Sequence, residues 1–107
     1  MTQVDQSYGT PAIIIRPYSG TTGPGSIAAN SNTEVNATSQ PVDVNDQGWV
    51  MFYPGVTPAN NVRPGTFRCT TAGTAIISWN NPTAGALTPT APTATTPYLF
   101  VIVKSGL

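Results

Sequence analysis

Residues that could perform catalysis are few in this sequence. The chain of 107 residues contains no histidine, one cysteine, four carboxylates and four cationic side chains. Without an imidazole, the chain lacks the commonest general base and metal ligand, and every catalytic triad that needs one is excluded. One cysteine and four carboxylates also make a zinc site implausible. We therefore expect a protein that is not an enzyme, with no catalytic, cofactor-binding or metal-binding residues and no cofactor.

Two places in the sequence come nearest to chemistry. Cys69 lies in the middle of an expected strand, and because no activating base is evident, a small core residue is the favoured interpretation. Residues 43–48 begin like a calcium-binding loop, with oxygen-bearing side chains at alternate positions and Gly48 sixth. The twelfth position should be a glutamate and is Pro54. The spacing of Asp43 and Asp46 also defines no glycosidase cleft. A turn is therefore favoured here.

Charge is nearly absent. Charged residues make up 7% of the chain, and the formal net charge is zero. Four scattered cations cannot neutralise the phosphates of a nucleic acid or attract a membrane surface, so neither partner is expected. Threonine, serine, asparagine and glutamine supply the polar surface instead, and these side chains cost much less to bury than ions. The composition indicates an assembly or binding module.

Proline and glycine recur so often that no helical period lasts ten residues. A two-residue connection at 72–73 predicts a tight hairpin, with Phe67 and Cys69 on one face of its first strand. Ile77 and Trp79 share a face of its second strand. The expected strands are residues 12–16, 33–38, 42–44, 49–53, 66–71, 74–80 and 98–104, and the last is apolar enough to predict a central position, buried on both faces.

The expected fold is all-β and forms a single domain over residues 1–107. Six or seven short strands with turns about every ten residues indicate a small β-sandwich or barrel, with a jelly roll as one option. Residues 1–11 are expected to form an extended N-terminal arm, and residues 81–97 a long loop of threonine, proline and alanine. No signal peptide or span of ~20 apolar residues is evident, so we expect synthesis in the cytoplasm.

Aromatic side chains are the remaining candidates for binding. Those in the expected strands are interpreted mainly as core, whereas Tyr8 and Tyr18 lie outside the strands and near the N-terminal arm. We expect a protein interface there. Its candidate residues are Thr2, Gln3, Val4, Gln6, Tyr8 and Tyr18.

The stretch Pro64-Gly65-Thr66-Phe67-Arg68 is similar to a Ser-Gly-Thr-Phe-Arg stretch in one member, of similar length, of the decoration (cement) proteins of tailed-bacteriophage heads. The chain also resembles that family in its short all-β pattern, single cysteine, low charge and abundant threonine and proline. The resemblance implies a structural virion protein on the capsid surface, whose partner is the major capsid protein. It further implies homo-oligomers, with trimers favoured, that clamp neighbouring capsomers after capsid expansion. It implies no catalytic or cofactor residues.

An alternative function belongs to a different class. A carbohydrate-binding or adhesin-like module of a phage head or tail fibre would present a patch of exposed aromatic rings. Trp49 and Tyr53, four residues apart in an expected strand, are the candidates for such a patch.

Overall fold

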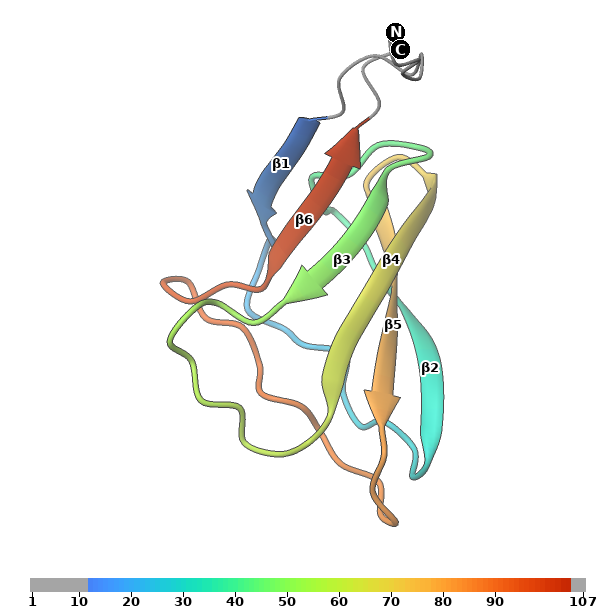
Figure 1. Cartoon of the computed structure of the whole chain (residues 1–107), viewed down its shortest axis with the longest axis vertical. Coiled ribbons are helices and arrows are strands. Elements are labelled where there is room, and N and C mark those ends of the chain that lie inside the picture. Colours follow the sequence, from blue (N-terminus) through green and yellow to red (C-terminus); the bar gives the residue numbers. More distant parts are fainter. Residues whose placement is uncertain (1–11, 105–107) are drawn as a thin grey trace, which may run out of the picture.

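The computed structural model describes residues 12–104, so the expected arm at residues 1–11 lies outside the described residues. Within that range the chain forms six strands and no helix (Figure 1). In particular, residues 12–104 contain no long apolar helix of the kind that crosses a membrane. The strands are β1 (Ala12–Pro17), β2 (Ser31–Ala37), β3 (Gln47–Met51), β4 (Arg63–Thr71), β5 (Thr74–Asn81) and β6 (Leu99–Lys104).

All six strands belong to one antiparallel sheet in the order β1-β6-β3-β4-β5-β2. The all-β prediction is confirmed, and the six strands match the expected number. The barrel alternative is wrong, because β1 and β2 do not pair within residues 12–104 and the sheet stays open. The sheet instead curls, so that β5 and β2 lie behind the plane of β1, β6 and β3 (Figure 1).

The predicted hairpin is confirmed. Strand β4 ends at Thr71 and β5 begins at Thr74, and these two residues are paired. Gly73, in the connection between them, adopts a φ of 86°. A positive φ is readily accessible to glycine, which explains why this residue suits the turn. Phe67 and Cys69 are both buried, as their shared face predicts.

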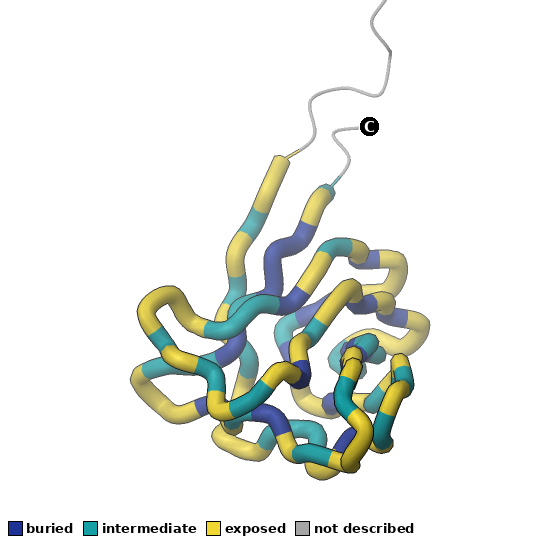
Figure 2. The backbone as a smooth tube through the Cα atoms, turned by 60° about the horizontal axis from the view of Figure 1, so that its bottom comes forward, coloured by how far each residue is buried: buried dark blue, intermediate teal, exposed yellow. Residues whose placement is uncertain are grey.

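The core lies on the inner, concave side of the curled sheet. Trp79, Tyr98 and Phe100 are at most 1% exposed, and the Trp79 and Tyr98 rings lie 5.5 Å apart. Phe67 contacts Phe100 edge-on at 5.2 Å between ring centroids. Such ring pairs stabilise a core by about 0.5–1.5 kcal/mol beyond the burial of their area. Figure 2 shows the exposed residues on the connecting loops and along β1.

Two expectations about individual strands need correction. Residues 42–44 form no strand; Val42 is only 3% exposed and lies in the core from an irregular segment, which explains its apolar character. Strand β6 is paired on both sides, with β1 and β3, so it is an interior strand as expected, one place in from the edge. Phe100, Val101 and Ile102 are buried in succession, as expected, but Val103 is 41% exposed because nothing in residues 12–104 covers it.

A buried amide links the segments that follow the two edge strands. The Gln40 side chain accepts a hydrogen bond from the N–H of Ser19 at 2.7 Å and donates to the Ser19 carbonyl at 3.1 Å. It also donates to the Thr38 carbonyl at 3.2 Å. Gln40 is 7% exposed, and hydrogen bonds in such surroundings are strong because water does not compete. A side chain thus holds together the two ends of an open sheet.

A second buried amide anchors the long loop between β5 and β6. Asn81 is fully buried, and its NH₂ group donates to the carbonyls of Ile27 and Gly85, both at 3.0 Å. Its carbonyl accepts from the N–H and hydroxyl of Thr83 at 2.9 and 2.6 Å. All four hydrogen-bonding positions of the amide are therefore used. A single bridge between Ile27 and Leu87 continues this attachment.

Candidate interaction surface

The convex side of β1, β6 and β3 carries exposed apolar side chains. Ile15 is paired with Val101, which is paired with Trp49, and these three residues form one row across the strands. Ile13 is paired with Val103, which starts the neighbouring row. Because side chains alternate along a strand, directly paired residues project from the same face of the sheet. We call these five residues the outer apolar face.

The exposure of these side chains is high for large hydrophobic residues. Ile13 is 65% exposed, Ile15 60%, Trp49 43% and Val103 41%. Val101 is 5% exposed because it lies between Ile15 and Trp49 in the same row. Single exposed hydrophobic residues are common, but a contiguous group of them on one face is typical of a surface that binds another molecule.

The two edges of the sheet differ in chemistry. Strand β1 exposes Ile13 and Ile15, whereas the exposed positions of β2 are Asn32, Glu34 and Asn36. The Glu34 carboxylate also accepts two hydrogen bonds from Arg68, at 2.9 and 3.0 Å. Charges and polar side chains protect an edge strand from pairing with another chain. The β2 edge has this protection, and the exposed isoleucines of β1 do not provide it.

Tyr18 is the one sequence-predicted interface residue within the described range. Its ring is partly buried, lies edge-on to Tyr98 at 5.0 Å and stacks near Phe100 at 5.9 Å. Its hydroxyl donates to the Thr22 carbonyl at 2.9 Å, and burial raises the pKa of this phenol. Tyr18 thus packs against the core, and a contact with a partner stays a prediction. Thr2, Gln3, Val4, Gln6 and Tyr8 lie outside the described residues.

Sequence reasoning did not single out Ile13, Ile15 or Val103. The run of three isoleucines was interpreted only as a strand, because an apolar strand can be buried on both faces as easily as exposed at an edge. The one available signal was that residues 12–15 contain no polar side chain on either face. Trp49 was named as a candidate, but for binding sugars.

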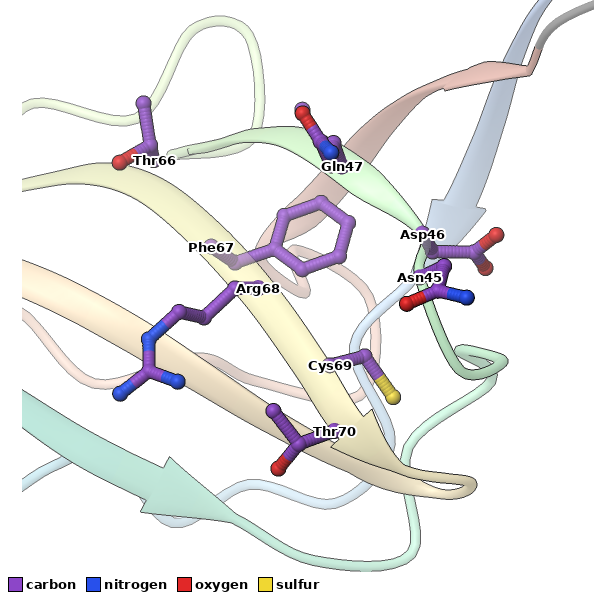
Figure 3. Close-up of a pocket in the computed structure, with 9 residues that line it drawn as sticks. Asn45, Asp46, Gln47, Thr66, Phe67, Arg68, Cys69 and Thr70 are labelled. Carbon is purple, nitrogen blue, oxygen red and sulfur yellow. The ribbon is translucent and has the colours of Figure 1, made fainter.

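A hollow of about 490 Å³ lies between β3 and β4. Figure 3 shows Arg68 directed away from Asp46 and Cys69 around this hollow. The charged groups there are already engaged: Arg68 contacts Glu34, and Asp46 contacts Lys104 at 2.6 Å. The buried Cys69 thiol donates to the Thr71 carbonyl at 3.1 Å. The lining residues described here therefore present no thiol or carboxylate free for nucleophilic or acid–base chemistry.

The segment that begins like a calcium loop is a turn, as the sequence favoured. The Asp46 N–H donates to the Asp43 carbonyl at 3.0 Å, and the Asp43 N–H donates to the Asp46 carboxylate at 2.9 Å. The Lys104 ammonium lies 2.6 Å from the Asp46 carboxylate and 3.6 Å from the Asp43 carboxylate, so a lysine of this chain balances their negative charge. Within residues 12–104, no three potential ligand side chains are grouped for a metal.

The Asp46 carboxyl titrates at an altered pH. Burial by itself raises its pKa, but the Lys104 ammonium and the Asp43 N–H outweigh this and hold the pKa below the ordinary 3.8. The pKa of Lys104 is raised in return, chiefly by the hydrogen bond to Asp46. The ion pair is thus most stabilising at pH values above the pKa of Asp46 and below the pKa of Lys104, where both groups are charged. It weakens as acid protonates Asp46.

Replacing Asp46 with asparagine should reduce stability at neutral pH by about 2 kcal/mol, the usual contribution of hydrogen bonds to a charged group. The pKa of Asp46 is lower in the folded protein than in the unfolded chain. The charged Asp46 therefore contributes fully to stability above pH 3.8, and this contribution disappears as the pH falls through the pKa of the folded protein. As the pH is lowered from neutral to below 3.8, Asp46→Asn should therefore lose less stability than the natural protein. Urea unfolding at several pH values measures this. Glu34→Gln, in an exposed pair, is the control and should change stability much less.

Comparison with known proteins leaves the function to be argued from the molecule itself. No protein-family model, no curated protein and no solved structure matches the chain. The outer apolar face and the adjoining β1 edge are the features within residues 12–104 from which we argue function.

Proposed function

We propose that this protein is a structural virion protein that decorates and stabilises a bacteriophage capsid by binding between capsomers of the major capsid protein. The observation that supports this most is the outer apolar face beside the edge strand β1. Such a surface suits a protein that works against other proteins. The homo-oligomer that the family resemblance implies is part of the same proposal.

The electrostatics of the described residues agree with this function. Glu34 pairs with Arg68, and Asp46 pairs with Lys104, so these ions are engaged within the chain. An interface made by apolar side chains, hydroxyls and amides depends little on salt, because ionic strength screens only charges. Capsid binding should therefore persist at high ionic strength. Since the protein would bind only the assembled shell, binding would stabilise that state by mass action.

One further feature supports the proposal. The stretch Pro64–Arg68, which resembles the decoration proteins, lies at the start of β4. We also propose that the curled sheet is a variant of the β-sandwich, of which the jelly roll is the form found in many viral capsid domains. The N-terminal residues 2–10, which precede β1, would add to a strand edge of the capsid protein by β-augmentation.

Deleting residues 2–10 should weaken binding to expanded capsids at least about tenfold, because main-chain hydrogen bonds supply affinity in β-augmentation. Co-sedimentation with expanded and unexpanded heads of the phage that carries the gene measures the binding. The temperature at which the heads release DNA measures their stability. Asn32→Ala, on the β2 edge, is the control and should bind like the natural protein. If the full chain does not co-sediment, or if the deletion changes neither measurement, the proposal fails.

A specific observation also supports the carbohydrate-binding alternative. Trp49 and Tyr53 are 43% and 39% exposed, whereas Trp79 and Tyr98 are buried. Sugar recognition combines a stacking ring with hydrogen-bonding groups around it. The row neighbour of Trp49 on β6 is the aliphatic Val101, which favours a protein partner. A glycan array would reverse this preference if it found a ligand whose binding is lost in Trp49→Ala.

A further inference from the structure

We propose that β1 pairs with β1 of a second copy of this chain across a two-fold axis. The axis would pass through Ile14, so that Ile13 of one copy lies opposite Ile15 of the other. The two six-stranded sheets would then join edge to edge into one continuous sheet. This inference concerns the protein alone and does not depend on binding to a capsid. It proposes a dimer in place of the trimer that the family resemblance favours.

The geometry of β1 permits this pairing. Its register with β6 runs without interruption from Ala12–Lys104 to Pro17–Leu99, whereas the β4–β5 ladder has two irregularities. No other strand of residues 12–104 pairs with β1, so one side of its backbone has no partner among these residues. Proline, bulges and charges are the usual protection of an edge strand. Between Ala12 and Ile15 the strand has none of them, and Pro17 stands at its end.

The charges are compatible with a second copy. Arg16 is the one charged residue of β1, and its guanidinium donates to the Pro41 carbonyl at 3.3 Å. In the proposed register Arg16 lies opposite Ala12 of the other copy. The two arginines are then about 13 Å apart along the strands, four residues at ~3.3 Å each. This separation exceeds the screening length of ~8 Å at physiological salt, so their repulsion is weak.

The side chains favour a second β1 over the other edge of the sheet. Pairing β1 with β2 of another copy would place Ile13 and Ile15 among Asn32 and Glu34. Pairing β1 with itself instead brings four isoleucines together, and cross-strand pairs of apolar residues stabilise a sheet. The resulting contact is isologous and closes at two copies. A trimer would need a head-to-tail contact, which this edge does not provide.

The size of the contact sets its strength. One strand and one row of side chains cover less than the ~800 Å² per partner that stable complexes bury. We therefore expect a dimer that forms with rising concentration, with a Kd of about 1–100 µM and not in the nanomolar range. Dimerisation would extend the row of Ile15, Val101 and Trp49 into a surface shared by both copies.

Sedimentation equilibrium of the full chain over about 1–500 µM tests the dimer. The data should fit a monomer–dimer equilibrium, and Ile15→Lys should weaken it at least about tenfold, because the change places like charges near each other in a strand pair. Asn32→Lys, at the corresponding exposed position of the β2 edge, should leave dimerisation unchanged. Both variants alter exposed positions, and thermal unfolding should confirm that they fold. A monomer throughout, a trimer, or equal weakening by both variants would overturn the proposal.

Cysteine cross-linking tests the register. Ile13→Cys and Ile15→Cys are both exposed changes, and in the proposed register each position faces the other across the axis. Mild oxidation should therefore cross-link a mixture of the two variants, since directly opposite residues lie within disulfide distance. Either variant alone should cross-link much less, because in this register a cysteine is two residues away from the position directly opposite the same cysteine of the other copy. Cross-linking of one variant alone to the same extent, or none in the mixture, would rule out this register.

Discussion

Replacing Gly48 with alanine is expected to destabilise the protein by at least about 4 kcal/mol, a loss that is exceptional for a single substitution. Gly48 lies in β3, directly paired with Ile102 of β6. A Cβ atom at this position would lie 1.8 Å from the Val101 carbonyl oxygen and 2.9 Å from its carbonyl carbon. Both atoms belong to the backbone, so no side-chain rotation can relieve the overlap. The two strands would have to separate in the middle of the sheet.

Urea unfolding of Gly48→Ala measures this loss, and near-ultraviolet circular dichroism shows whether Trp79 keeps its packed surroundings. Gly65→Ala is the matched control, because Gly65 also lies in a strand, β4, and has a negative φ. Its added Cβ would lie 3.4 Å from the Ser78 carbonyl oxygen and 4.0 Å from the Ser78 Cβ, which are ordinary contact distances. This variant should differ from the natural protein by less than about 1 kcal/mol. Equal stability of Gly48→Ala and Gly65→Ala would contradict the close approach of β3 and β6.

Replacing Asn81 with alanine is expected to cost about 3 kcal/mol. The change removes four hydrogen bonds and leaves the carbonyls of Ile27 and Gly85 and the N–H of Thr83 without this partner. The carbonyls keep one donor each, the Leu87 N–H on Ile27 and the Thr83 hydroxyl on Gly85. Each lost hydrogen bond costs about 0.5–1.5 kcal/mol, and water entering the site would recover part of the sum. Because Asn81 attaches the loop 82–98, the loop should also become more accessible to proteases.

Chemical denaturation and limited proteolysis measure the two effects of Asn81→Ala. The neighbouring residue provides the control: Asn80 is exposed, and Asn80→Ala should change stability by less than about 0.5 kcal/mol. Asn81→Asp should be at least as damaging as the alanine variant, since a carboxylate cannot donate to the two carbonyls. If Asn80→Ala and Asn81→Ala were equally mild, the buried amide would not be holding the loop.

Much of the local structure follows from the sequence. The alternation in residues 66–71 and 74–80 predicted the β4–β5 hairpin and its buried face, because side chains on a strand repeat every two residues. Glycine at position 73 indicated the turn, since a positive φ is accessible to it without strain. The absence of histidine and the scattered positions of the carboxylates, both visible in the sequence, limit the chemistry that the chain can perform.

The order of the strands was decided by tertiary structure. The sequence of Ile13 and Ile15 is compatible with a buried strand, and only the pairing of β1 with β6 alone places these residues on an exposed edge. A period of two shows which residues share a face, but not what that face meets, because pairing partners come from distant parts of the chain.

Contacts between distant parts of the chain also explain why the roles of Val42, Gln40 and Asn81 do not follow from the sequence. Val42 was expected in a strand and is instead a core residue of an irregular segment. The partners of Gln40 and Asn81 lie up to 21 and 54 residues away along the chain, so no local pattern reveals that these amides are buried. By itself the sequence determined six of the seven expected strands, the hairpin and the scarcity of reactive groups. Tertiary structure alone decided which apolar residues form the core and which remain on the outer apolar face, because long-range strand pairing determines what covers each face.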